Sequence, residues 1–109
     1  MIAPRFGSLH DGAAPVAGGE SFSELARVGG ARVERVASRA VTDGAWYEQA
    51  WTEFVLLVAG SAALEFADGS RRELKPGEWA LLPALCRHRV AWTDPAGETL
   101  WLAVHLPPG

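Results

Sequence analysis

Turn-forming residue pairs recur along most of the chain, and their spacing restricts the fold more than any other feature of the sequence. Asp68-Gly69, Pro76-Gly77 and the stretch 94–97, which reads DPAG, each separate two short runs of apolar or alternating residues. Such signals recur roughly every 8 to 12 residues, a spacing typical of β-sandwiches and β-barrels. No internal repeat and no long amphipathic helix competes with this pattern. The sequence therefore predicts an all-β fold.

The expected strands lie between these turns, and each has the composition of a strand that is buried on at least one face. They cover residues 31–41, 53–60, 62–67, 71–74, 79–83, 87–93 and 98–106. Residues 54–60 form a continuous apolar run, whereas residues 64–66 alternate Leu, Glu and Phe. A barrel or sandwich built from them would bury one face of each strand.

The first part of the chain has a different composition. Residues 1–20 are rich in Gly, Ala and Pro without periodicity, which predicts a loosely held arm. In residues 21–28, which read SFSELARV, Ser21 or Ser23 is suited to cap one short helical turn that Gly29-Gly30 would end. We therefore expect an irregular or briefly helical arm over residues 1–30 and a barrel over residues 31–109.

Composition limits the classes of function. With 109 residues and 49% hydrophobic content the chain is suited to a single packed domain. A net charge of -3 with scattered basic residues gives no footprint for nucleic acid. The longest apolar run, residues 54–60, falls far short of the roughly 20 residues that span a membrane. One cysteine, Cys86, and one lysine, Lys75, favour a cytoplasmic protein from a GC-rich bacterial genome.

Two spaced motifs carry a resemblance to a known family. Gly77, Pro83 and His88 lie at the spacing of the second motif of the cupins, and Glu53 and Gly60 match the second half of the first motif. The chain from about Trp46 to Leu106 thus resembles the small, largely uncharacterised single-domain bacterial cupins. The resemblance implies a double-stranded β-helix, or jelly-roll, barrel. It also implies a divalent metal in the barrel mouth, with Glu53 and His88 on ligand positions.

The two histidines of the first cupin motif are absent from this sequence. Their positions fall on Tyr47 and Gln49 with one spacing, or on Trp46 and Glu48 with the other. Gln49 lies four residues before Glu53, so the two share a face if the segment is extended. We prefer Gln49 as the ligand, and we assign Tyr47 or Glu48 to proton transfer.

His105 is a further candidate ligand. If residues 94–97 join the last two strands as a hairpin, Thr93 opposes Glu98, and His105 opposes Cys86. His105 then shares the inward face with His88. The predicted metal set is Gln49, Glu53, His88 and His105, which suits Zn²⁺, Mn²⁺, Fe²⁺ or Ni²⁺. The missing first-motif histidines leave a metal-free barrel as the alternative.

Three tryptophans predict the lining of a pocket, and three aliphatic residues predict an interface with a second copy of the chain. Trp79 lies in an expected core strand, and Trp92 and Trp101 share the hairpin face of His88, so the three are candidates for a pocket lining. Leu100, Leu102 and Val104 on the other face would be exposed on a monomer, which predicts a homodimer.

Two hypotheses of function follow. In the first, the barrel binds one divalent metal and acts on a small organic molecule, by a reaction that the sequence does not specify. In the second, it is a non-catalytic binding or sensing cupin. The architecture alone does not choose between them.

Overall fold

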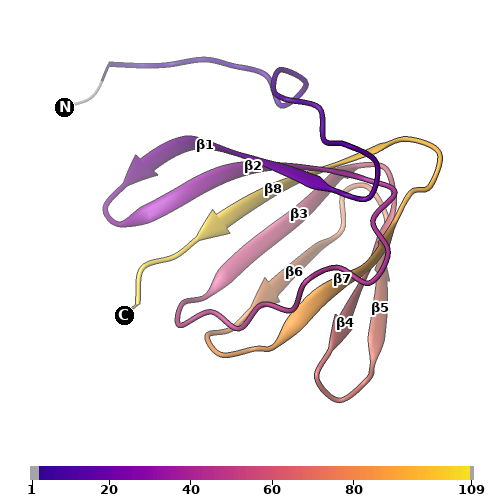
Figure 1. Ribbon diagram of the computed structural model, residues 1–109. Coiled ribbons are helices and arrows are strands. Elements are labelled where there is room, and N and C mark those ends of the chain that lie inside the picture. Colours follow the sequence, from indigo (N-terminus) through magenta and orange to yellow (C-terminus); the bar gives the residue numbers. More distant parts are fainter. Residues whose placement is uncertain (1–2, 109) are drawn as a thin grey trace.

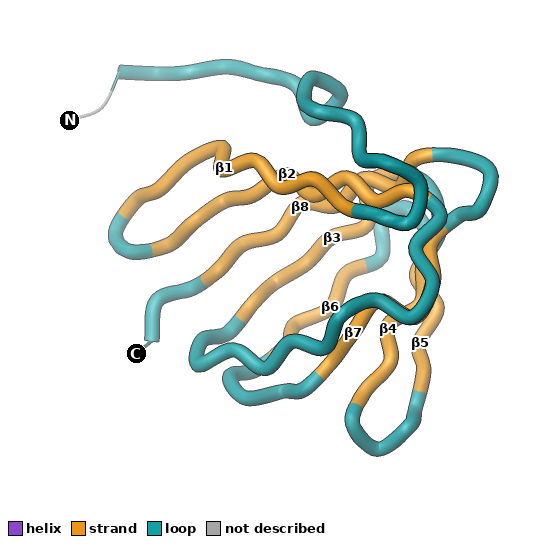
Figure 2. The backbone as a smooth tube through the Cα atoms, in the orientation of Figure 1, coloured by secondary structure: helices purple, strands orange, loops and turns teal. Residues whose placement is uncertain are grey.

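A computed structural model describes residues 3–108, and within that range the chain forms eight strands. Their order along the chain is clear in Figure 1, and Figure 2 shows that loops join them. The strands are β1 (Glu20–Val28), β2 (Ala31–Arg39), β3 (Glu53–Ala59), β4 (Ala62–Phe66), β5 (Arg71–Leu74), β6 (Trp79–Leu82), β7 (His88–Thr93) and β8 (Glu98–His105). None of the residues in the described range belongs to a helix that is long and apolar enough to cross a membrane.

The strands form two antiparallel sheets that face each other. One sheet has the order β1-β2-β8-β3-β6 and the other the order β5-β4-β7. Strand alternation turns one side of each sheet inward, so Val55 and Leu57 of β3 and Trp101 and Ala103 of β8 enter the core. Leu64 of β4 meets them from the smaller sheet. This is the expected all-β jelly-roll barrel.

The predicted pairing of the last two strands is wrong. Strand β7 pairs with β4, whereas β8 lies between β2 and β3 in the other sheet. Residues 94–97 therefore carry the chain from one sheet to the other and do not close a hairpin. The backbone N–H of Asp94 and the hydroxyl of Thr99 both donate to the carbonyl of Ser61, which fixes this crossing beside the turn between β3 and β4.

The predicted helical turn near the N-terminus is also wrong, because residues 20–28 form strand β1. Gly29 and Gly30 have φ values of 58° and 82°, and they close a tight hairpin between β1 and β2. Two central residues with positive φ are the signature of the turn that best matches strand twist. The pair of glycines thus marks a hairpin and not the end of a helix, and the larger sheet begins at Glu20.

Two of the three predicted pocket tryptophans lie elsewhere. The register of β7 against β4 shifts so that Ala63 opposes Trp92 while Leu64 opposes Val90, which leaves Ala91 as an extra residue. This bulge reverses the alternation, and Trp92 leaves the face that carries His88. Trp79 is 59% exposed and stacks on Phe54 with ring centroids 5.4 Å apart.

The outer face of the larger sheet has an exposed apolar area, although the residues that form it differ from those predicted. Leu100 is buried at 5% exposure, so it is not part of an exposed patch. Leu102 and Val104 are partly exposed, and their register partners on β3 are Leu56 and Phe54. Leu81 on β6, which pairs with Phe54, is 55% exposed.

Arg35 fastens the N-terminal arm to the outer face of β2. Its side chain is 2% exposed, and its Nε donates to the carbonyl of Leu9 at 2.6 Å. The guanidinium also reaches the carbonyl of Ala13 at 3.4 Å and Glu98 at 3.3 Å. Beyond this anchor the arm runs back above β1 (Figure 1), where Arg5 Nη2 donates to the carbonyl of Leu25 at 2.9 Å, and Phe6 on it is 97% exposed.

Candidate functional site

A cavity of about 340 Å³ opens between the two sheets. Its apolar lining comes from the inward faces of both sheets and includes Phe22, Val36, Val55, Leu64, Val90 and Trp101. Its polar lining includes Glu20, Glu34, Glu53, His88 and His105. Of the predicted site residues, Tyr47, Gln49, Glu53, His88, His105 and Trp101 line this cavity. Binding sites for small molecules commonly combine an apolar body with a few such polar groups.

Glu53 and His88 face each other in the cavity, 3.9 Å apart between Oε1 and Nε2. His88 Nδ1 lies 2.8 Å from the carbonyl oxygen of Cys86. Since a carbonyl only accepts, Nδ1 carries the proton and Nε2 presents its lone pair toward Glu53. A backbone carbonyl that fixes the histidine tautomer in this way is the usual support of a metal-binding imidazole.

Tyr47 and Gln49 reach the same region because their segment is held against the start of β7. Tyr47 and His88 exchange both backbone hydrogen bonds, at 2.8 and 3.0 Å, and the carbonyl of Gln49 accepts from Leu85 N–H. The Gln49 amide nitrogen donates to Glu53 Oε1 at 2.9 Å. Glu48 is exposed and does not line the cavity. Of the two predicted alternatives, the structure therefore brings Tyr47 and Gln49 to the cavity.

His105 lies beside Glu53 in the sheet but turns to different partners. Its Nδ1 is 2.9 Å from Trp51 Nε1, and its Nε2 is 3.0 Å from Glu34 Oε1. Both ring nitrogens are therefore engaged. Residues 3–108 contain no group of three or more His, Cys, Asp or Glu side chains placed to hold one metal ion. A metal at Glu53 and His88 would need Gln49 or solvent as a further ligand.

Glu20, at the start of β1, also lines the cavity. Its carboxylate accepts from the Ser38 hydroxyl at 2.5 Å, and Ser38 in turn accepts from Trp101 Nε1 at 3.1 Å. Burial raises the pKa of Glu20, with a smaller contribution from the negative charge of Glu53. Burial also raises the pKa of Tyr47, which feels Glu20, Glu53 and Glu34. The carboxylates of Glu20, Glu34 and Glu53 are therefore close enough to influence the same part of the cavity electrostatically.

Comparison with known proteins supports the assignment of the fold and identifies the family. The sequence matches no protein-family model, and no curated protein matches it significantly. Among solved structures, a protein from Ralstonia eutropha JMP134, provisionally named a mannose-6-phosphate isomerase, is 42% identical. The match covers 94% of this chain and 97% of the Ralstonia chain, with a TM-score of 0.81. A cupin superfamily protein from Desulfitobacterium hafniense DCB-2 matches over 86% of this chain and 83% of its own, with 20% identity and a TM-score of 0.66.

The chain belongs to the cupin superfamily. A more distant match, Fe(II)-HppE, is 16% identical over 80% of this cupin and has a TM-score of 0.71. This cupin spans 49% of the HppE chain, and at that identity the likeness concerns the fold alone.

Several cavity residues of this cupin were not predicted from its sequence. Glu20, Phe22 and Glu34 lie on β1 and β2, and the expected helical turn concealed the alternation of Glu20 and Phe22. A Gly-Gly pair flanked by two alternating segments would have predicted the hairpin that brings them inward. Trp51 does not line the cavity but contacts His105 behind it, and no local signal predicts this contact because it joins residues far apart in the chain.

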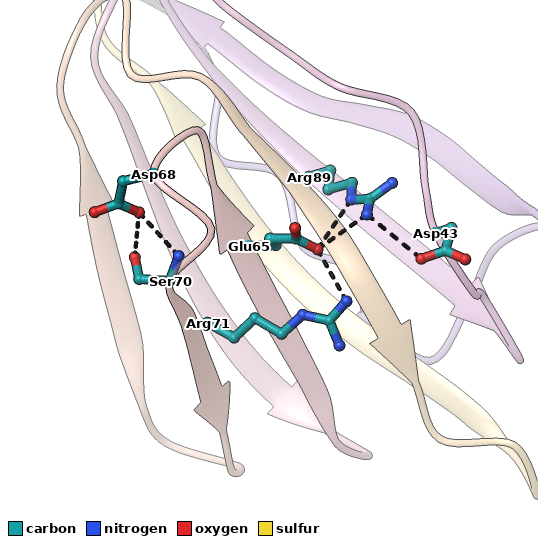
Figure 3. A network of polar contacts seen from close by, with 6 residues as sticks. All are labelled: Asp43, Glu65, Asp68, Ser70, Arg71 and Arg89. Carbon is teal, nitrogen blue, oxygen red and sulfur yellow. Dashed lines mark hydrogen bonds and ion pairs between the residues drawn. The ribbon is translucent and has the colours of Figure 1, made fainter.

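The outer face of the smaller sheet carries charges that do not take part in the cavity. Figure 3 shows Glu65 between Arg71 and Arg89, and Arg89 also reaches Asp43. The hydrogen bond from Arg89, followed by that from Arg71, lowers the pKa of Glu65. Arg87 and Arg89 lie over the ring of Trp46 at 5.0 and 4.7 Å. As predicted from alternation, these arginines point away from His88.

Proposed function

We propose that this cupin binds a small organic molecule in the cavity between its sheets. The observation that carries the proposal is the cavity itself, about 340 Å³ in volume, with aliphatic and aromatic walls and a polar group of Glu53, His88 and Gln49. A ligand that enters would bury its apolar part against Val36, Trp101 and their neighbours.

Filling the cavity tests this proposal directly. Val36 is 8% exposed and lines the cavity, so Val36→Phe should occupy part of its volume. We expect ligand-observed NMR to detect small aromatic and aliphatic fragments that bind the wild-type protein, and Val36→Phe to weaken that binding by about ten-fold or more. Val16→Phe on the arm, where Val16 is 78% exposed, is the matched control and should bind like wild type. Fragment binding that is unaffected by Val36→Phe would place the ligand elsewhere.

We also propose that Glu53 and His88, with the side-chain oxygen of Gln49, form a site for one divalent metal, Zn²⁺, Mn²⁺, Fe²⁺ or Ni²⁺. The facing arrangement of Glu53 Oε1 and His88 Nε2 supports it, as does the tautomer that the Cys86 carbonyl imposes. Gln49 would have to rotate its amide so that oxygen replaces nitrogen. His105 is left out of the set because Trp51 and Glu34 occupy its nitrogens. A cation bound there would polarise an oxygen of the ligand.

The substrate in the name of the Ralstonia relative, a sugar phosphate, does not suit the charge of this cavity. A sugar phosphate would bring negative charge to a lining that already holds Glu20, Glu34 and Glu53, and Arg32 is the only arginine among the lining residues that the structure describes. The second hypothesis, a non-catalytic binding or sensing protein, needs only the cavity. The missing first-motif histidines favour it, whereas Glu53 and His88 favour the metal site.

We propose a homodimer through the outer face of the larger sheet. Trp79 and Leu81, which are 59% and 55% exposed, lie beside Phe54 and extend the apolar area of Leu102 and Val104. Exposed apolar areas of this kind commonly mark protein interfaces. We expect light scattering after size-exclusion chromatography to give twice the chain mass, and Leu81→Glu to give a monomer. A wild-type monomer at micromolar concentration would contradict the proposal.

A further inference from the structure

Trp51, His105 and Glu34 form a directed hydrogen-bond chain at the cavity wall. The indole N–H of Trp51 can only donate, so the His105 Nδ1 that it meets at 2.9 Å must accept. The proton of the neutral imidazole is then on Nε2, which donates to Glu34 Oε1 at 3.0 Å. His105 is 7% exposed, and Trp51 also packs edge-on against it. The chain holds His105 in one tautomer and Glu34 in one position.

Glu34 is thereby held at the cavity wall as a hydrogen-bond acceptor. Within residues 3–108 it makes no ion pair with an arginine or lysine, and the neutral imidazole of His105 does not cancel its charge. Arg32 lines the same cavity, but its guanidinium lies over the ring of Trp51, 5.8 Å from the centroid. The second oxygen of the Glu34 carboxylate has no partner in the described contacts of the protein. A ligand can supply one.

The remaining walls decide what kind of group would complete this site. Phe22, Tyr47 and Trp101 offer aromatic surfaces, which attract cations as well as apolar groups. Among the described lining residues, the carboxylates of Glu20, Glu34 and Glu53 outnumber the single guanidinium of Arg32. The cavity therefore favours a cationic hydrogen-bond donor beside Glu34 over a neutral or anionic group, because a charge-assisted bond to a carboxylate is about twice as strong as a neutral one.

We infer that the cavity takes a small amine in its protonated form, with the ammonium group bound by Glu34 and the apolar body against the aromatic and aliphatic walls. This inference rests on the proposed function, since it names the class of molecule that the same cavity binds. It assigns to His105 and Trp51 the role of positioning Glu34. Neither residue is assigned a role in metal binding.

Matched probes of one shape and different charge test the inference without any variant. Benzylammonium, benzyl alcohol and benzoate are titrated into the full-length chain after chelator treatment, so that no metal contributes charge. Chemical shifts of the Trp101 indole report binding in the cavity. We expect benzylammonium to bind about ten-fold or more tightly than benzyl alcohol, and benzoate to bind most weakly.

Glu34→Gln then tests the residue. It keeps the shape of the side chain and removes the charge, so it should weaken benzylammonium binding by about ten-fold and leave benzyl alcohol within about two-fold. Glu24→Gln is the matched control, because Glu24 is the register partner of Glu34 on β1, pairs with Arg27 and does not line the cavity. It should bind all probes like wild type. Nitrogen shifts of His105 should show a protonated Nε2 in wild type and a change of tautomer population in Trp51→Phe.

The outcomes separate this inference from the proposal on which it rests. Equal binding of benzylammonium and benzyl alcohol at Trp101 would overturn the preference for an amine while leaving the cavity as a binding site. A preference for benzylammonium that survives Glu34→Gln would overturn the role of Glu34. If no probe shifts Trp101 and no fragment binds the wild-type cavity, both the inference and the proposed function fail.

Discussion

Replacing Gly60 by alanine should destabilise the protein by about 3 to 5 kcal/mol, because the added methyl group would collide with the backbone of β8. Gly60 lies between β3 and β4 with φ at 90°. A Cβ added there would lie 2.5 Å from Thr99 Oγ1, 2.8 Å from Thr99 Cα and 3.0 Å from the carbonyl oxygen of Glu98. Backbone atoms of β8 cannot move away without disturbing the corner at which the chain passes between the sheets.

Gly77→Ala is the matched control for this prediction. Gly77 has the same φ of 90°, but no heavy atom lies within 4 Å of its added Cβ. Its substitution should cost only the backbone strain, about 1 to 2 kcal/mol. Urea unfolding followed by circular dichroism, at one protein concentration, gives both values. Equal losses in the two variants would show that the close approach of β8 to Gly60 has no energetic consequence.

Replacing Arg35 by methionine should loosen residues 8–14 of the N-terminal arm and cost about 2 to 4 kcal/mol. The guanidinium is buried and holds the carbonyls of Leu9 and Ala13 together with the carboxylate of Glu98. Methionine keeps the apolar stem but removes the donor to the Leu9 carbonyl and to Glu98, whereas the Ala13 carbonyl keeps its bond from the Ser21 hydroxyl. The arm also packs closely on this side chain, since a Cβ on Gly12 would lie 2.6 Å from Arg35 Nη1.

Hydrogen exchange measures this second effect locally. Amides of residues 8–14 should exchange faster in Arg35→Met, and the free energy of unfolding should fall in urea. Arg39→Met is the control, because Arg39 lies on the same strand, is exposed and is the register partner of Glu98. Unchanged exchange of the arm in Arg35→Met would mean that other contacts hold it.

The sequence predicted the parts of the molecule that depend on local pattern. The turn pairs indicated the all-β class, and Gly77, Pro83 and His88 pointed to the cavity. His105 points inward as predicted although the pairing used to place it is wrong. The reason is that alternation along β8, from Trp101 through Ala103 to His105, does not depend on which strand lies beside it.

What the sequence did not predict depends on contacts between distant segments. Arg35 stands in an alternating strand and reads as an exposed charge, yet the arm folds over it and buries it. The bulge at Ala91 that turns Trp92 away is visible only in the register of β7 against β4. The link from Trp51 through His105 to Glu34 joins three segments, so no spacing in the sequence predicts it.

The metal content of the purified protein tests the proposed metal site of Glu53 and His88 most directly. Tag-free wild-type protein, purified without chelator and then soaked in Zn²⁺, Mn²⁺, Fe²⁺ or Ni²⁺ in turn, is analysed by elemental mass spectrometry after desalting. His88→Ala is compared with His10→Ala, in which the exposed histidine of the arm is removed. We predict about one metal per chain in wild type and His10→Ala, its loss in His88→Ala, and a thermal stabilisation by metal that is lost with it. Absence of metal from the wild-type protein, or equal metal in all three proteins, would contradict the metal site.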